Sequence, residues 1–196
     1  MRIKREEITI PNLLTSVRIV VVPFIVIEVL KERMHAAFYI FFIGGITDLL
    51  DGFIARRFNM VTKTGAFLDP AADKIFMVPT IIVLSLKGLI PSWACFIFVG
   101  KDLFIALSIG ILYLIKKNVP INPTFAGKSA MFLEATYLFF VMIDAFINGS
   151  APVEILKTSF LYISVLSAIL AGLSYIPVGM SIIGLSQHSF SNVKKE

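Results

Sequence analysis

The chain has 196 residues, of which 57% are hydrophobic and only 16% are charged, and its mean hydropathy is +0.88. A soluble domain carries about 25% charged residues, so the composition excludes an ordinary soluble protein and predicts an integral membrane protein with a single domain, 1–196. The net charge of +5 does not indicate nucleic-acid binding, because the basic residues stand at the ends of apolar runs, and the single cysteine, Cys95, excludes an intrachain disulfide.

Six apolar runs follow one another along the chain, each near the roughly 20 residues that a bilayer requires. They predict an all-α, polytopic membrane protein with six transmembrane helices. Polar residues, glycines and prolines separate the runs, as is typical of turns. The predicted spans are Leu13–Leu30, His35–Arg57, Ala66–Leu86, Ser92–Ile115, Gly127–Asn148 and Val153–Ile176.

The two ends of the chain are more polar than its helical core, which we expect over residues 13–186. Residues 1–12 are expected to form a short juxtamembrane segment on the membrane surface. After Pro177, the chain is expected either to continue the sixth helix or to form a seventh short one, and the tail, 187–196, is expected to be frayed. Pro23 is expected to kink the first span.

Basic residues are distributed unequally between the two sides that six spans would define. Both termini would lie on the richer side, and positively charged loops stay in the cytoplasm. We therefore expect the termini and the turn after the second span to face the cytoplasm, at the inner membrane. The richer side carries Arg2, Lys4, Arg5, Arg56, Arg57, Lys63, Lys116, Lys117, Lys128, Lys194 and Lys195, and the other side carries Lys31, Arg33, Lys87 and Lys157.

Four carboxylates stand around the junction of the second and third spans, in the stretch DLLDGFIARRFNMVTKTGAFLDPAAD. Asp48 and Asp51 are three residues apart, and Asp69 and Asp73 are four apart, so each pair lies on one face of its helix. If these helices are antiparallel, the two pairs face each other near one membrane surface. Ionisable residues within a membrane usually mark function, and four like charges cannot stay ionised together without cations.

The chemistry of this stretch favours a metal and a flat ligand. Its carboxylates offer only oxygen ligands, which suit Mg2+ or Mn2+ rather than zinc. Gly52, Ala55 and Gly65 leave the neighbouring helix surfaces without bulky side chains, so that a ligand can approach the backbone. Two structural alternatives stay open, namely bridges between the acids and Arg56 and close helix packing at the small residues.

The stretch matches the pattern D-x2-D-G-x2-A-R-x8-G-x3-D-x3-D at all eight fixed positions. In this it resembles the CDP-alcohol phosphotransferase family of membrane enzymes, whose six-helix core also fits the six predicted spans. The resemblance implies that two divalent cations, Mg2+ or Mn2+, are held by Asp48, Asp51, Asp69 and Asp73, with Asp73 as the general base. It also implies that the CDP moiety is bound by Asn12, Thr15, Gly52, Ala55, Arg56 and Gly65.

Cations for the phosphate of an acceptor come from other parts of the chain. The stretch PNLLTSVR resembles the start of bacterial family members, in which this segment lies against the nucleotide and the metals, and FAGK resembles a Gly-Lys at the foot of the fifth span. The candidates for the acceptor site are Arg18, Lys63, Lys101 and Lys128. The alternatives are a helix cap by Asn12, snorkelling by Arg18, and an ion pair of Lys101 with Asp102 or Glu134.

The resemblance implies an enzyme that transfers the phosphatidyl group of CDP-diacylglycerol to an alcohol and releases CMP. Glycerol 3-phosphate is the expected acceptor, because DGFIARR and FLDPAADK resemble bacterial phosphatidylglycerophosphate synthases. Phosphatidylglycerol, as in the family's cardiolipin synthases, and inositol phosphate are the alternatives. The resemblance also implies a homodimer. A cation transporter is a different alternative, since carboxylates line ion paths too, but it predicts acids spread along a pore rather than clustered on two helix faces.

Overall fold

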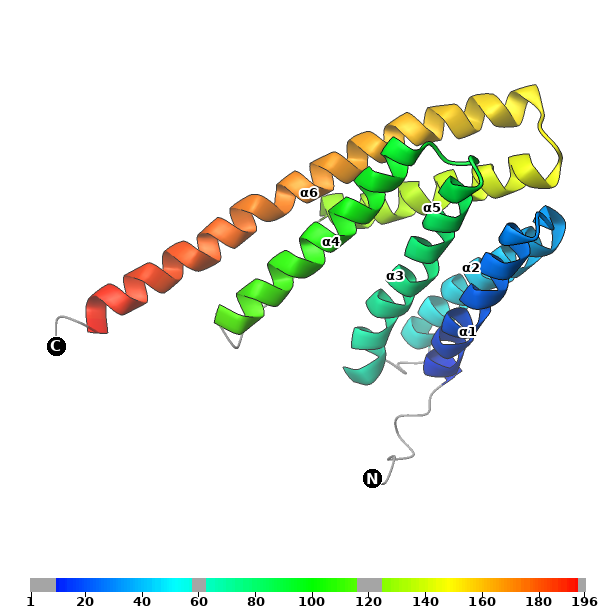
Figure 1. Cartoon of the computed structure of the whole chain (residues 1–196). Helices are drawn as coiled ribbons and strands as arrows, with labels where there is room; N and C mark the ends of the chain where they lie inside the picture. Colours follow the sequence, from blue (N-terminus) through cyan, green and yellow to red (C-terminus); the bar gives the residue numbers. More distant parts are fainter. Residues whose placement is uncertain (1–9, 58–62, 116–124, 194–196) are drawn as a thin grey trace. The chain divides into compact units, whose positions relative to one another are not determined.

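The structure, a computed structural model, describes residues 10–57, 63–115 and 125–193, with side chains at 15–48, 50, 57, 71–108, 110 and 125–175. Within these residues it contains six α-helices and no strand, which confirms the all-α prediction (Figure 1). The helices are α1 (Ile10–Leu30), α2 (Met34–Arg57), α3 (Lys63–Leu86), α4 (Ser92–Ile115), α5 (Phe125–Phe146) and α6 (Ala151–Val193). The surface segment expected at 1–12 lies largely outside the described residues.

Three of the turns between helices contain a residue in the left-handed region that closes a helix end. Glu32 (φ 60°), Gly88 (φ 74°) and Gly149 (φ 84°) follow α1, α3 and α5. Behind them, Arg33 N–H donates to the Glu28 carbonyl (2.9 Å) and Leu89 N–H to the Leu84 carbonyl (3.0 Å), as at a helix C-terminus closed by a left-handed residue. These turns stand at the predicted breaks, and two of the three residues are glycines, which adopt this conformation at low cost.

The C-terminal helix is longer than predicted. Helix α6 continues through Pro177 to Val193, so the alternative of a continued sixth helix is confirmed. The helical core was expected to end at residue 186 and to be followed by a frayed tail, but the chain is helical as far as Val193. A proline inside a helix removes a single backbone hydrogen bond, and helices of membrane proteins tolerate this loss. Pro23 likewise lies inside the continuous helix α1.

The described chain forms two compact units. The first comprises the chain up to Ser92 together with Leu138–Ile155, and the second comprises Trp93–Tyr137 and the chain from Leu156 onward. The first unit therefore contains α1, α2, α3 and the second half of α5, and the second contains α4, the first half of α5 and most of α6. That residues 1–196 form one functional domain stays a prediction.

In the first unit, α1 packs along both α2 and α3 (Figure 1). The buried residues Val22, Ile25 and Val29 follow one face of α1 at helical spacing. Between α2 and α3, the rings of Phe41 and Phe76 stack with their centroids 5.4 Å apart. One turn along α2, a Cβ at Gly44 would lie 2.6 Å from the Phe76 ring, so α2 and α3 approach closely only because residue 44 has no side chain.

In the second unit, buried contacts join α4, α5 and α6. The rings of Phe98 in α4 and Tyr137 in α5 lie 6.0 Å apart, and the Ser164 hydroxyl in α6 donates to the Leu133 carbonyl in α5 at 2.9 Å. The Ser164 side chain is buried together with Ala168 and Ala171 on the same face of α6. This face of α6 therefore packs inward, while large apolar side chains such as Tyr162, Leu166 and Leu170 are exposed.

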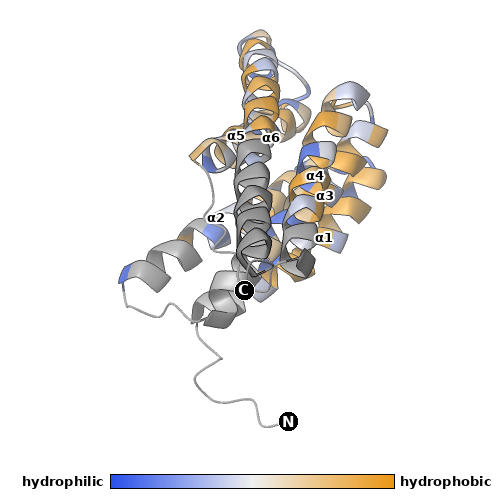
Figure 2. Ribbon diagram, turned by 90° about the vertical axis from the view of Figure 1, so that its left-hand side faces the viewer, coloured by the Kyte–Doolittle hydropathy of each residue, from blue (hydrophilic) through white to orange (hydrophobic). Residues whose placement is uncertain are grey.

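Large apolar side chains are exposed on every one of the described helices, for example Phe24, Phe42, Ile75, Phe96, Phe132 and Leu166. Figure 2 shows hydrophobic residues along the described parts of α3, α4 and α6. A soluble monomer rarely exposes such extended apolar surface. In the described chain, two segments are long and apolar enough to cross a membrane, Phe125–Phe146 and Ala151–Tyr175. These features agree with a membrane protein, whereas the number of six transmembrane helices stays a prediction.

Candidate active site

Arg18 joins three helices through two carboxylates. Its Nη2 lies 2.6 Å from Oδ1 of Asp48 in α2, and its Nη1 donates to Oδ1 of Asp73 in α3. The Arg18 side chain is 2% exposed, whereas that of Asp48 is 49% exposed and that of Asp73 is 26% exposed. The guanidinium is therefore buried in the first unit, and the two carboxylates lie between it and the surface.

The two acids meet because they occupy matching depths on α2 and α3. Asp48 stands nine residues before the end of α2 at Arg57, and Asp73 stands ten residues after the start of α3 at Lys63. At 1.5 Å per residue these distances are about 14 and about 15 Å. Since the chain reverses between the two helices, the carboxylates reach the same level. The predicted convergence of the acids is confirmed for this pair.

This geometry is compatible with a divalent cation. Both carboxylates contact the same guanidinium, and both supply the oxygen donors that Mg2+ and Mn2+ prefer. The backbone of Asp51 lies in α2 one turn from Asp48, and that of Asp69 lies in α3 one turn from Asp73. The side chains of Asp51 and Asp69 lie outside the described residues, and among the described side chains no group of three or more metal-binding residues gathers.

The direct contacts of Arg18 with these acids were not predicted, although its segment was expected to lie against the nucleotide and the metals. Sequence reasoning placed Arg18 in the acceptor site and considered bridges from Arg56 only. A signal was present, because an arginine within an apolar helix requires a partner, and the only acid of α1 is Glu28, ten residues away. Arg18 instead contacts two of the acids that were expected to hold metal. An acceptor role for Arg18 stays a prediction.

Other residues predicted to bind CDP fall on the same helices. Thr15 is fully buried in α1, one turn before Arg18. The remaining predicted side chains of the first unit lie outside the described residues, namely Asn12, Gly52, Ala55, Arg56, Lys63 and Gly65.

A second cluster of buried charges lies in the second unit, between α4 and α5. Lys101 Nζ lies 2.5 Å from Oε2 of Glu134 and 3.2 Å from Oδ1 of Asp102. All three residues are buried. The ion-pair alternative for Lys101 is therefore confirmed, and its ammonium is already engaged by two carboxylates. Lys128, by contrast, is exposed in the first turn of α5.

Comparison with known proteins adds to this geometry. Residues 8–172 match the family described as CDP-alcohol phosphatidyltransferase. The chain is 30% identical over 176 residues to a CDP-diacylglycerol–glycerol-3-phosphate 3-phosphatidyltransferase of Rickettsia felis, an alignment that covers 87% of this chain and 95% of the relative. The corresponding protein of Rickettsia bellii is 31% identical over 170 residues, or 85% of this chain and 92% of the relative.

A relative named for a different activity is also similar. A cardiolipin synthase (CMP-forming) of Streptomyces coelicolor is 30% identical over 140 residues, which cover 67% of this chain and 64% of the relative. The chain thus spans less than two thirds of this relative's length, whereas it spans nearly all of the Rickettsia proteins.

Proposed function

The chain belongs to the CDP-alcohol phosphatidyltransferase family, and we propose that it transfers the phosphatidyl group of CDP-diacylglycerol to glycerol 3-phosphate, with release of CMP. Family membership makes the chain an enzyme, with CDP-diacylglycerol and an alcohol as its substrates. The observation that carries the proposal is the convergence of Asp48 and Asp73, from two helices, onto the guanidinium of Arg18. Glycerol 3-phosphate is favoured because the relatives named for it align over nearly their whole length.

In this proposal the four acids hold two Mg2+ or Mn2+ ions, with Asp51 and Asp69 completing the pair that meets at Arg18. Bound ions would draw charge from the pyrophosphate and stabilise the leaving CMP. Asp73 accepts the proton of the attacking hydroxyl at a carboxylate oxygen. The hydroxyl oxygen bonds to the phosphorus next to the lipid, and the bond from that phosphorus to CMP breaks, without a covalent enzyme intermediate.

Arg18 positions the acids in this mechanism. A guanidinium presents its N–H groups in a rigid fork, and the two Nη atoms of Arg18 each contact a different carboxylate. The contacts orient Asp48 and Asp73 before substrate binds. The nucleotide would then lie against Asn12, Thr15, Gly52, Ala55, Arg56 and Gly65.

The acceptor phosphate needs a cationic side chain that does not already contact carboxylates of the protein. The ammonium of Lys101 contacts Glu134 and Asp102, so it offers little positive charge to a second anion. The ammonium of Lys128 is exposed. Among the predicted acceptor residues Arg18, Lys63, Lys101 and Lys128, we therefore assign the phosphate contact to Lys128, with Lys63 as a second candidate.

An acceptor screen tests the proposed reaction. Purified enzyme, CDP-diacylglycerol and Mg2+ would be offered glycerol 3-phosphate, phosphatidylglycerol or inositol phosphate in turn, with CMP release as the measurement. Turnover with glycerol 3-phosphate alone is the expected result. Turnover of phosphatidylglycerol alone would instead establish the cardiolipin synthase activity that the similarity to the Streptomyces coelicolor protein supports.

Metal dependence is a separate prediction of the same site. EDTA should abolish CMP release, and Mg2+ or Mn2+ should restore it, because these ions accept compact sets of carboxylate oxygens. Ca2+ should not restore it, since its coordination is larger and looser. Full activity in EDTA would contradict the two-metal site even if the acceptor were correct.

The cellular setting that we propose is the inner membrane, crossed by six spans, with both termini and the acids on the cytoplasmic side. CDP-diacylglycerol would enter from the bilayer and the soluble acceptor from the cytoplasm. We also propose a homodimer, which the family resemblance supports and which the mass of the protein in mild detergent would test.

A further inference from the structure

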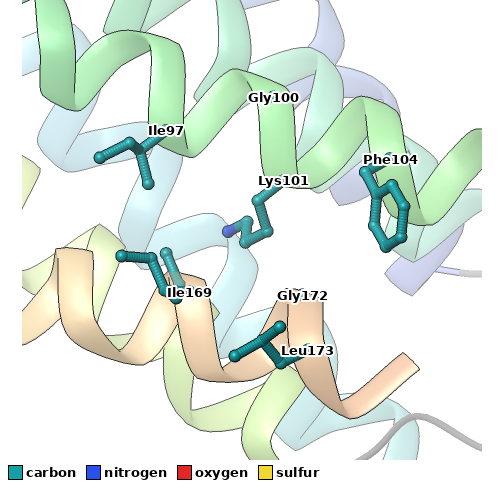
Figure 3. Close-up of a pocket in the computed structure, with 8 residues that line it drawn as sticks. Ile97, Gly100, Lys101, Phe104, Ile169, Gly172 and Leu173 are labelled. Atoms are coloured by element: carbon teal, nitrogen blue, oxygen red, sulfur yellow. The ribbon is translucent and has the colours of Figure 1, made fainter. Parts of the chain in front are cut away.

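A pocket of about 300 Å³ lies between α4 and α6 in the second unit, and none of the residues that line it belongs to α1, α2 or α3 (Figure 3). Its walls are apolar except for one lysine. The lining residues are Ile97, Gly100, Lys101, Phe104, Ala168, Ile169, Gly172 and Leu173.

The pocket exists because each helix carries a glycine where a side chain would fill it. Gly100 of α4 and Gly172 of α6 both line the space, and a Cβ built on either would meet nothing within 4 Å. A glycine inside a helix costs about 1 kcal/mol relative to alanine. The two glycines are not required by close packing, in contrast to Gly44, so they keep a space open at a cost in helix stability.

Lys101 contributes its hydrocarbon stem rather than a charge to this pocket. In Figure 3 the side chain runs from α4 along the gap between the two helices. Its ammonium is engaged by Glu134 at 2.5 Å and Asp102 at 3.2 Å. One cation with two carboxylates leaves no excess positive charge for a phosphate, and long lysine stems commonly cover apolar surface. The charge distribution therefore disfavours an anionic headgroup and favours hydrocarbon.

The surroundings of the pocket are apolar too. Phe104, Ile169 and Leu173 line it and are also exposed by 46, 46 and 54%, so the pocket opens outward. Next to them on the same helices, Leu107 and Leu170 are exposed. The segment Ala151–Tyr175 of α6 has the length and composition of a membrane span. In a bilayer, the medium that reaches such an opening is the acyl chains of lipids.

We propose that this pocket binds one acyl chain of a membrane phospholipid. A cavity of about 150 Å³ holds benzene, which has six carbons, so 300 Å³ accommodates about twelve carbon atoms of a chain. The chain lies between Gly100 and Gly172, against Ile169 and the Lys101 stem. This site is independent of which alcohol the enzyme uses.

Leucine substitutions at the two glycines test the proposal by filling the pocket. Gly100→Leu and Gly172→Leu place a side chain in the open space, and leucine forms helices better than glycine, so both variants should fold. Gly110→Leu is the matched control, because Gly110 is an exposed glycine of α4 that also has nothing near its Cβ but does not line the pocket. The probe is phosphatidylethanolamine, which is none of the acceptors considered for the enzyme, titrated into delipidated protein in mild detergent and counted by native mass spectrometry.

The wild-type protein and Gly110→Leu should retain one tightly bound phosphatidylethanolamine per chain. Gly100→Leu and Gly172→Leu should bind it at least about tenfold more weakly, a loss of about 1.4 kcal/mol. Equal lipid retention in all four proteins would overturn the proposal. So would a change of oligomeric mass in the two pocket variants with lipid retention intact, since a second copy of the chain would then fill the pocket. CMP release plays no part in this measurement, so a failure of the proposed reaction would not affect it.

Discussion

Arg18 illustrates how a buried charge in this protein depends on its partners. The guanidinium is almost fully buried, and it contacts Asp48 and Asp73 on two other helices. Removal of one partner from a buried ion pair is costly because the other charge remains desolvated. Here the cost is smaller than for a fully buried pair, since about half of the Asp48 side chain is exposed.

We predict that Arg18→Met lowers the free energy of unfolding by roughly 2 kcal/mol and reduces CMP release more than Arg18→Lys does. Lysine retains the charge but not the fork that reaches two carboxylates. Melting temperature and kcat/KM, measured on the same preparations, check both effects. Arg33→Met is the control, because Arg33 is an exposed residue with a long contact of 3.8 Å to Glu28, and it should behave as wild type. Wild-type activity in Arg18→Met would contradict the positioning role.

The two lysines predicted for the acceptor should respond differently to the same substitution. Lys128→Met removes an exposed charge and should raise the KM for glycerol 3-phosphate about tenfold, or about 1.4 kcal/mol, with little change in melting temperature. Lys101→Met leaves Glu134 and Asp102 buried together and should lower the free energy of unfolding by about 3–5 kcal/mol.

Steady-state kinetics with varied glycerol 3-phosphate, together with thermal unfolding, would separate these effects. A stable Lys101→Met protein with a raised KM would restore Lys101 to the acceptor site. An unchanged KM in Lys128→Met would remove Lys128 from it.

At the scale of helices, α2 and α3 approach each other closely at Gly44, which has the tightest surroundings of the described glycines. The Phe76 ring lies where a side chain of residue 44 would begin, and it is held by stacking on Phe41 at 5.4 Å. The ring is buried, so it has little room to move aside. This contact lies one turn before Asp48 on α2, and the helix separation that it sets also determines how closely Asp48 and Asp73 approach.

We predict that Gly44→Ala destabilises the protein by about 1–2 kcal/mol, because the strain of overpacking exceeds the gain in helix propensity. The adjacent Gly45→Ala is the matched control, since its Cβ would meet nothing within 4 Å. It should instead stabilise the helix by up to about 1 kcal/mol. Thermal unfolding of both variants gives the comparison, and truncation of the ring in Gly44→Ala/Phe76→Leu should recover part of the loss. Stabilisation by Gly44→Ala would show that α2 and α3 separate easily.

A contact between turns also joins elements distant in the sequence. Lys87, after α3, donates to Glu32, after α1, at 2.8 Å. The hydrogen bond and the charge of Lys87 lower the pKa of the Glu32 carboxyl below its usual value. A lowered pKa means that the contact stabilises the fold above the carboxyl's usual pKa and loses this effect as the pH falls through the lowered value. Because both groups are near the surface, this contribution is small.

For the whole molecule, the distribution of basic residues predicts an arrangement across the membrane. In a protein whose single native cysteine is replaced (Cys95→Ser), Lys31→Cys should react with a membrane-impermeant maleimide added to intact cells, and Lys128→Cys should react only after the cells are opened. Both positions are exposed in the structure, so accessibility of the side chain itself is matched. The reverse pattern would invert the predicted orientation, and equal labelling of both before opening would contradict an odd number of spans between them.

What the sequence by itself determined is the part of the protein that depends on local spacing. Apolar runs bounded by glycine and polar residues predicted the six helices, because helix formation and termination depend on neighbouring residues. The spacing of three and four residues between acids predicted the pairing of carboxylate-bearing faces, and the motif around them predicted the family. The end of α6 at Val193 was not predicted, because a proline removes one backbone hydrogen bond without necessarily ending a helix.

The tertiary structure decided which charges meet. Arg18 and Asp73 are 55 residues apart, and Lys101 and Glu134 are 33 residues apart. Such contacts depend on the rotation and depth of each helix against its neighbours, which no periodicity within one helix specifies. The same reason applies to the glycines. Gly44 meets the ring of Phe76, whereas Gly100 and Gly172 leave a pocket open, because the packing of the opposing helix, rather than the glycine itself, determines what occupies the space.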